Sequence, residues 1–195
     1  MLERILTAAE LARQLADALE SANLPYAVGG AIALAYYAPP RATVDVDLNV
    51  FVSPTGGLSR VVEVLAQAGF EPDEPLPALQ RRAETDGQFR GRAHGLRVDV
   101  FVPAFAFYAE LESRRRGVKL GERPIWILSP EDLVVLKMMF FRRKDLADVE
   151  AVLRDQKGKL DRAAVRQKLV ELVGEDDERL RELEKIENDV DEDAG

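Results

Sequence analysis

The chain contains no cysteine and a single histidine, His94. Without cysteine it can form no disulfide framework, no zinc–thiolate site and no thiol nucleophile. With one histidine it can hold neither a histidine-rich metal site nor a histidine pair for acid–base catalysis. The absence of disulfides agrees with a cytoplasmic location, which we expect for this protein.

Long apolar runs are also absent. No segment approaches the roughly 18 consecutive apolar residues of a membrane-spanning helix, so we expect no membrane association. Residues 1–20 carry charges within their apolar pattern and therefore do not resemble a secretion signal. Hydrophobic residues nevertheless make up 47% of the chain, which is typical of a globular core.

Negative charge is concentrated at one end. The formal net charge is −8, and residues 175–195 contain 11 acidic and three basic side chains. The other 174 residues contain 24 acidic and 24 basic side chains. The body of the protein can therefore present basic surface, and its clearest basic clusters are "SRRRG" (residues 113–117) and "FRRK" (residues 141–144).

Hydrophobic periodicity and turn residues predict helices interleaved with strands. The predicted helices are residues 3–22, 31–37, 58–69, one continuous helix that begins after Ser129, and 161–173. The predicted strands are residues 26–28, 43–52, two joined near residues 94–95, and a hairpin within 110–128; residues 72–79 are predicted to form a loop.

This order predicts an α/β (α+β) fold, with a small mixed β-sheet, flanking helices and a C-terminal helical segment. The predicted domains are a core at residues 1–128, a helical segment at 129–174 that packs on the core, and an acidic, solvated tail at 175–195.

The motif "TVDVDLNVF" places two aspartates in a strand. Residues two apart in a strand point to the same face, so Asp45 and Asp47 lie about 6–7 Å apart on one side. Two unpaired carboxylates this close repel each other unless a cation lies between them. Their oxygen atoms favour a hard cation, either Mg²⁺ or Mn²⁺. The alternative is an exposed edge strand with two solvated aspartates.

A third carboxylate, Asp99, lies within the apolar strand "RVDVFV". If this strand neighbours the first, Asp99 joins Asp45 and Asp47 as a third metal ligand. Three carboxylates are typical of two-metal phosphoryl-transfer sites. The alternative is that Asp99 forms a salt bridge with Arg97 or Arg41.

Gly29 and Gly30 lie at a predicted strand–helix junction. Glycine permits close approach of the backbone, and the first turn of a helix offers free N–H groups to phosphate. A plain turn is the alternative interpretation.

The segment after Ser129 begins with Pro130 and has Asp132 three residues after the N-cap, which is a strong helix start. In a continuous helix Lys137, Lys144 and Asp148 would share one face. These residues could contact phosphate or RNA; alternatively, Lys137 is an ordinary lysine with a buried stem and an exposed charge, and residues 142–144 form a solvated basic turn.

Taken together, "VGGAIALAYYAPPRATVDVDLNVF", "VDVF" and "SPEDLVVLKMMFFRRKDLADVEAVL" resemble the nucleotidyltransferase superfamily of the DNA polymerase β type, and within it the AbiEii or MenT-like toxin branch. The resemblance spans roughly residues 24–155. It implies that Asp45, Asp47 and Asp99 hold metal, with Asp99 as a possible proton acceptor, and that Gly29 and Gly30 bind triphosphate. It further implies that Arg41 and Thr43 line the entrance to the aspartate strand, that Lys137 contacts phosphate, and that Lys144, Asp145 and Asp148 form a charged group behind it.

The activity implied by this resemblance is transfer of a nucleoside monophosphate (NMP) from an NTP to an acceptor. The leading acceptor is the 3′ end of tRNA, in a toxin of a toxin–antitoxin system with a cognate antitoxin protein as a second partner. Three alternatives remain: a protein-modifying (NMPylating) enzyme, a catalytically weak antitoxin or regulator, and an interaction module with surface aspartates. Many superfamily members have Gly-Ser where this chain has Gly-Gly, so no serine hydroxyl is available at that turn.

Overall fold

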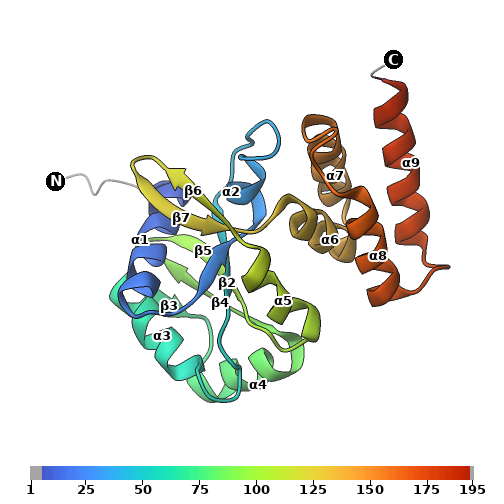
Figure 1. Cartoon of the computed structure of the whole chain (residues 1–195). Helices are drawn as coiled ribbons and strands as arrows, with labels where there is room; N and C mark the ends of the chain where they lie inside the picture. Colours follow the sequence, from blue (N-terminus) through green and yellow to red (C-terminus); the bar gives the residue numbers. More distant parts are fainter. Residues whose placement is uncertain (1–5, 194–195) are drawn as a thin grey trace. The chain divides into compact units, whose positions relative to one another are not determined.

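The computed structural model describes residues 6–193, and within them a seven-stranded mixed sheet has the order β3-β4-β5-β2-β1-β7-β6 (Figure 1). β2 pairs in parallel with β5, and β1 in parallel with β7, while the remaining pairs are antiparallel. The strands are β1 (Tyr26–Val28), β2 (Asp45–Val50), β3 (Phe70–Pro72), β4 (Gln88–Ala93), β5 (Leu96–Phe101), β6 (Arg116–Leu120) and β7 (Arg123–Ile127).

The helices confirm the predicted α/β class. They are α1 (Ala8–Ser21), α2 (Gly30–Leu34), α3 (Leu58–Gln67), α4 (Leu76–Asp86), α5 (Ala106–Arg114), α6 (Pro130–Phe140), α7 (Arg143–Asp155), α8 (Arg162–Val173) and α9 (Glu178–Glu192). Residues 3–5 of the first predicted helix lie outside the described part of the chain. Across residues 6–193, none of these helices combines the length and apolar character that crossing a membrane requires.

The chain divides into two compact units. The first is Met1–Ile32 with Ala42–Leu128, and the second is Ala33–Arg41 with Ser129–Gly195. The second unit therefore includes residues 33–41, which the sequence assigns to the core domain.

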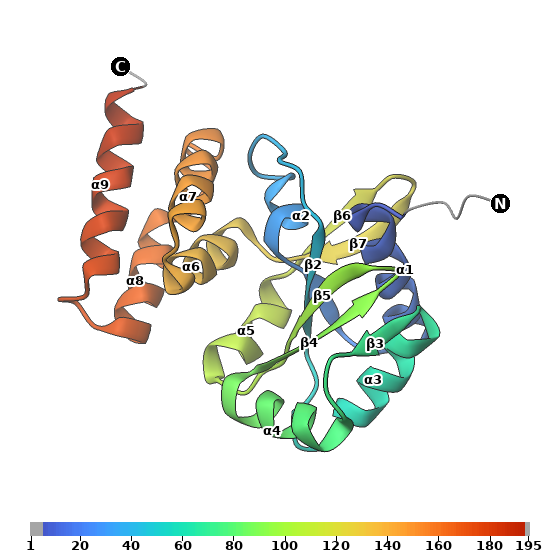
Figure 2. The ribbon, with the colours of Figure 1, turned by 180° about the vertical axis from the view of Figure 1, so that it is seen from behind.

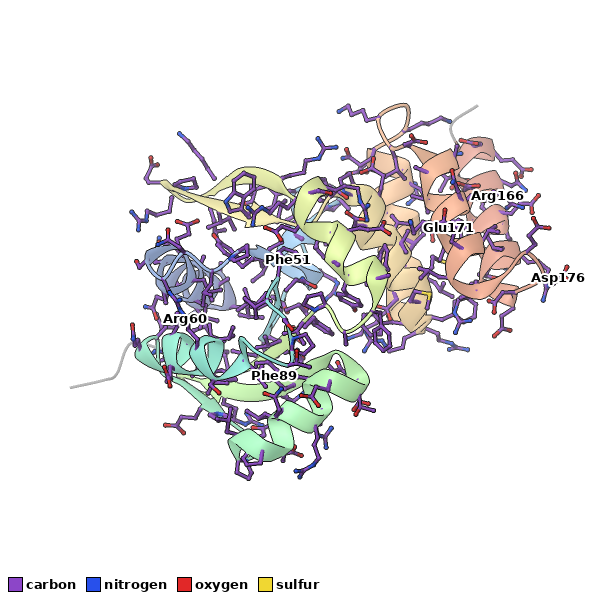
Figure 3. The ribbon with its side chains drawn as sticks, turned by 60° about the horizontal axis from the view of Figure 1, so that its bottom comes forward. Phe51, Arg60, Phe89, Arg166, Glu171 and Asp176 are labelled. Carbon is purple, nitrogen blue, oxygen red and sulfur yellow. The ribbon has the colours of Figure 1, made fainter. Side chains whose placement is uncertain are left out.

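In the first unit, one face of the sheet is apolar because the strands alternate. Val46, Leu48 and Val50 of β2 are fully buried. Tyr26 pairs with Val50, and its hydroxyl donates to Glu20 of α1 at 2.7 Å, so α1 covers this face. α3 lies beside α1, and Arg60 of α3 donates to the carbonyl of Ala22 at 2.8 Å (Figure 3).

The apolar face continues to the sheet edge formed by β3 and β4. Phe89 of β4 meets Phe70 of β3 edge to face, with ring centroids 6.3 Å apart. Figure 2 shows β3, β4 and β5 as neighbouring strands. The opposite face of β4, β5 and β2 carries alternating charged residues and contains the candidate site.

Two helices of the first unit, α4 and α5, are absent from the sequence prediction. α4 begins after Pro75 and has Pro77 in its first turn, where a missing N–H costs no helical hydrogen bond. α5 buries Phe107 and Leu111, one turn apart. The predicted loop was therefore wrong at residues 76–79, and α5 was not predicted.

In the second unit the predicted continuous helix is broken. Phe141 has a φ of 54° and ends α6, and α7 begins at Arg143. The predicted common helix face of Lys137, Lys144 and Asp148 is therefore wrong, because these residues come from two helices.

The acidic C-terminal segment differs from the predicted solvated tail. α9 forms within it and packs against α7 and α8. One side of this helix is buried although its composition is mostly charged, because its apolar residues recur every three or four positions. These buried residues are Leu180, Leu183, Ile186 and Val190.

Candidate active site

Three carboxylates share the charged face of the sheet. Asp47 pairs in register with Asp99, and Asp45 pairs with Arg97, between the parallel strands β2 and β5. Register partners point to the same face, as do residues two apart on one strand. Asp45, Asp47 and Asp99 therefore lie on one face of adjacent strands, which is the arrangement that the three-carboxylate hypothesis requires.

Arginine side chains compensate the charge of two of these aspartates. Arg97 Nη2 donates to Asp45 Oδ2 at 2.9 Å, and Arg97 Nε forms an ion pair with Asp99 Oδ2 at 3.0 Å. Arg90 of β4 donates to Asp99 Oδ1 at 2.5 Å. The predicted alternative of an Asp99–Arg97 salt bridge is thus present, whereas Arg41 pairs with Asp148 within the second unit.

Thr43 lies directly before β2 and supports its first aspartate. The hydroxyl of Thr43 donates to Asp45 Oδ1. Thr43 therefore belongs to the group around Asp45.

The glycine pair lies against Asp47. The N–H of Gly29 donates to the carbonyl of Asp47 at 2.8 Å. Gly30 has a φ of +54°, and a Cβ atom at this position would fall 1.7 Å from Asp47 Oδ2. Only glycine fits here, both because of the backbone conformation and because the carboxylate fills the space that a side chain would need.

Aromatic residues cover the site on the side of α5. Tyr108 of α5 stacks on Phe101 of β5, with ring centroids 6.3 Å apart. Burial, followed by the charge of Asp47, raises the pKa of Tyr108 to about 12. Its hydroxyl therefore stays protonated at neutral pH and can donate a hydrogen bond.

The donor chemistry of this face fits a hard divalent cation, because Asp45, Asp47 and Asp99 supply carboxylate oxygens from one face of adjacent strands. The carboxylates are not arranged as a ready cage. Among residues 6–193 no group of three or more acidic or histidine side chains stands in a metal-holding cluster. Arg97 takes up oxygens of both Asp45 and Asp99, so the metal site stays a prediction.

A pocket of about 120 Å³ opens beside Asp99. Its lining is mostly polar and comes from the segment after β3 and from α4, β4 and β5. The lining residues are Asp73, Glu74, Leu79, Arg82, Gln88, Phe89, Arg90 and Asp99.

A second charged cluster lies in the second unit. Lys137 of α6 is 6% exposed, and its Nζ lies 2.5 Å from Asp148 Oδ2 and 3.4 Å from Asp145 Oδ1. Arg41 forms two hydrogen bonds of 2.9 Å with Asp148, and Arg142 pairs with Asp145 at 2.6 Å.

The two buried aspartates of this cluster are held in their charged form. Burial raises the pKa of Asp148, but hydrogen bonds from Arg41 and Lys137, together with their charges, leave it below the usual aspartate value. Burial likewise raises the pKa of Asp145, and Arg142 and Lys137 bring it below the usual value.

The predicted site residues thus fall into two groups. The structure joins Gly29, Gly30, Thr43, Asp45, Asp47 and Asp99 in the first unit, and Arg41, Lys137 and Asp148 in the second. Lys144 is exposed at the start of α7. Whether these residues bind nucleotide stays a prediction.

Sequence reasoning did not assign a role to Arg90 or Tyr108. The signal for Arg90 was the strand pairing: the turn at His94 and Gly95 aligns Ala93 with Leu96, and therefore Arg90 with Asp99. No comparable signal identified Tyr108, because its helix was not predicted.

Comparison with known families gives one match that covers nearly the whole chain. The family described as "Nucleotidyl transferase AbiEii toxin, Type IV TA system" matches residues 11–194. No curated protein sequence matches the chain.

Solved structures share the fold at low sequence identity. ANT(2")-Ia in complex with adenylyl-2"-tobramycin has a TM-score of 0.53 and 17% identity, over 96% of this chain and 98% of that one. An antigenic nucleotidyltransferase-like protein from Paracoccidioides brasiliensis has a TM-score of 0.53 and 18% identity, over 92% and 94%. JHP933 from Helicobacter pylori has a TM-score of 0.51 and 16% identity, over 100% and 96%.

Proposed function

The chain belongs to the AbiEii family of nucleotidyl transferase toxins, and from this premise we propose that it uses a divalent metal to transfer an NMP from an NTP to the 3′ end of tRNA. Nucleotidyl transfer is the activity of the family. The metal, the tRNA acceptor and the toxin role are the parts that we propose for this chain.

The observation that carries the proposal is the placement of Asp45, Asp47 and Asp99. They occupy adjacent register positions on one face of two parallel strands. Bound there, a divalent cation would neutralise charge on the triphosphate and make the acceptor hydroxyl more acidic.

The rest of the chemistry follows from the surrounding residues. An acceptor oxygen forms a bond to the α-phosphorus of the NTP, and the bond from that phosphorus to the leaving pyrophosphate breaks. Asp99 accepts the acceptor's proton at a carboxylate oxygen, since it lies on the wall of the pocket beside the metal-binding face. Gly29 and Gly30 contribute the backbone turn that binds the triphosphate in this proposal, because the absence of a side chain at Gly30 brings the turn directly against the Asp47 carboxylate.

Lys137 is included in the proposal as a phosphate contact, with Arg41, Lys144 and Asp148 as its charged surroundings. Lys137 also has a structural role, because its buried ammonium group forms ion pairs with Asp145 and Asp148. The two roles predict different effects of replacing Lys137.

Transfer to the 3′ end of tRNA would block translation and thereby act as a toxin. A cognate antitoxin protein and a cytoplasmic location, where tRNA is found, belong to the same proposal. The support for these finer points is the family description and the sequence resemblance.

The test is incubation of the protein with Mg²⁺, purified tRNA and each of the four α-³²P-labelled NTPs in turn. We expect label on tRNA, with one NTP preferred, and no label with Asp47→Asn. Glu71→Gln is the control, because Glu71 is exposed on the edge strand β3. Label on protein from a cell lysate but not on tRNA would overturn the acceptor, and no label with any NTP would overturn the proposed transfer.

A further inference from the structure

Every carboxylate oxygen of Asp45 and Asp99 already contacts a hydrogen-bond donor or a guanidinium group. Asp45 accepts from the hydroxyl of Thr43 and from Arg97 Nη2, at 2.9 Å in the second case. Asp99 accepts from Arg90 Nε at 2.5 Å, and its other oxygen forms an ion pair with Arg97 Nε at 3.0 Å. A carboxylate oxygen can accept a hydrogen bond and also bind a metal, but a cation held between the two aspartates competes with Arg97, which contacts both.

Arg97 is the cationic partner common to both aspartates. It lies opposite Asp45 in register and two residues before Asp99 on β5, so all three side chains share one face. The planar guanidinium can donate to two carboxylates at once. The Arg97 side chain is 43% exposed and that of Asp45 is 25% exposed, so this ion pair is only modestly stabilising and can exchange with other partners. Asp99 is 8% exposed, but it retains Arg90 as a partner when Arg97 leaves.

We propose that Arg97 is a positioning residue that holds Asp45 and Asp99 together before metal binds, and that its guanidinium leaves their oxygens when a divalent cation arrives. The inference rests on the proposed function, because it takes these aspartates as the metal ligands. The anions able to receive the released guanidinium are the phosphates of the nucleotide.

This exchange couples metal binding to nucleotide binding. A cation that binds alone must displace Arg97 from its charge-assisted hydrogen bond with Asp45 and its ion pair with Asp99, and then remain near its positive charge. When nucleotide binds as well, the guanidinium regains hydrogen bonds to phosphate. Arg97 therefore weakens the binding of metal alone and makes metal and nucleotide favour each other.

The matched control for Arg97 is Arg92. Arg92 lies directly opposite Arg97 on β4, is exposed, and carries the same charge on the same face. Replacing Arg92 changes the local electrostatic field without touching the contacts to Asp45 and Asp99. Comparison of Arg97→Gln with Arg92→Gln therefore separates the specific exchange from a general effect of positive charge.

The experiment is a titration of the full chain with Mn²⁺ in the absence of nucleotide, in which the free Mn²⁺ is measured by electron paramagnetic resonance. We expect Arg97→Gln to bind Mn²⁺ about 10-fold more tightly than the wild type, which corresponds to one displaced charge-assisted contact. The Mn²⁺ affinity of Arg92→Gln should stay within about 2-fold of the wild-type affinity, because water and salt screen the loss of an exposed charge. Circular dichroism confirms that each variant is folded.

A fourth protein, Asp45→Asn, separates failure of this inference from failure of the metal site. If Asp45→Asn weakens Mn²⁺ binding but Arg97→Gln does not strengthen it, or Arg92→Gln strengthens it equally, the role of Arg97 is overturned. If Asp45→Asn binds Mn²⁺ as the wild type does, or no variant binds it, the proposed metal site itself is overturned.

Discussion

Two clusters of aspartates and basic side chains lie in the described part of this protein, one in each unit. Both contain exposed arginines and a nearly buried aspartate, but the second also contains a buried cation, Lys137. Asp45 is a quarter exposed and its partner Arg97 is 43% exposed. Lys137, Asp145 and Asp148 are at most 8% exposed by side chain. An exposed pair costs little to rearrange, whereas a buried pair that loses one partner leaves a charge without water.

The difference in burial assigns different roles to similar pairings. The cluster on the sheet can release its arginine to a ligand, which suits a reactive site. The cluster between α6 and α7 holds two helices together, which suits a structural site. The following predictions test this distinction, beginning with the largest expected effect.

Asp47→Asn should separate activity from stability in the first unit. We expect NMP transfer to fall by about 100- to 1,000-fold, because a metal ligand is lost where charge develops in the transition state. The melting temperature should change little, since Asp47 is only partly buried. Transfer kinetics and thermal melts measure the two effects, with Glu71→Gln as the control. A large loss of stability with unchanged NMP transfer would show that the cluster on the sheet is structural and not reactive.

Lys137→Met should affect the second unit in the opposite way. Removing the ammonium leaves Asp145 and Asp148 with one arginine partner each and should cost about 3 kcal/mol of unfolding free energy. The melting temperature should fall by about 6–12 °C. Lys144→Met is the control, because Lys144 is exposed on the same charged segment.

The same variant also tests the proposed phosphate contact of Lys137. At a temperature where it is folded, loss of a charge-assisted contact should lower NTP affinity or turnover by about 10- to 150-fold. Wild-type transfer across NTP concentrations, together with a lower melting temperature, would leave only the structural role.

Leu183→Ala should show that the acidic segment belongs to the helical unit. Leu183 of α9 is fully buried, so truncation should cost about 2–3 kcal/mol and lower the melting temperature by about 4–12 °C. Leu172→Ala on α8 is the control, because Leu172 is 36% exposed. Equal, small shifts in both variants would restore the view of a solvated tail.

Acid should destabilise the helical unit through Asp145 and Asp148, with the smallest of these effects. Their folded-state pKa values lie below those of an unfolded aspartate, so their contribution is complete above about pH 4. It is lost as the pH falls through the lowered pKa values. Melts between pH 7 and pH 2 should show a decline of a few degrees that is reduced in Asp148→Asn. An equal decline of the melting temperature in Asp148→Asn would show that other groups cause the acid sensitivity.

The sequence predicts the sheet better than it predicts the helices around it. Alternating residues in "TVDVDLNVF" and "RVDVFV" identify β2 and β5 and the common face of their aspartates. The His94-Gly95 turn has positive φ at both residues and fixes the β4–β5 register. Short-range geometry therefore determines much of the candidate active site.

The features that the sequence does not reveal depend on packing between distant segments. The composition of residues 175–195 suggests a solvated tail. Four apolar residues along one side of α9 are nevertheless enough to pack the helix against α7. The lysine and the aspartates of the buried cluster are visible in the sequence, yet their pairing depends on how α6 and α7 meet. The bond between Arg41 and Asp148 joins residues 107 positions apart, which no local pattern encodes.

The left-handed conformation of Phe141 makes chain length a constraint on the buried cluster. In one uninterrupted helix, Asp145 and Asp148 would lie about 12 and 16 Å along the axis from Lys137. The short connection between α6 and α7 reverses the chain, so that residues 8 and 11 positions apart form ion pairs. An insertion or deletion at this bend would separate the same charges without altering any of them, so the number of residues there matters as much as their identity.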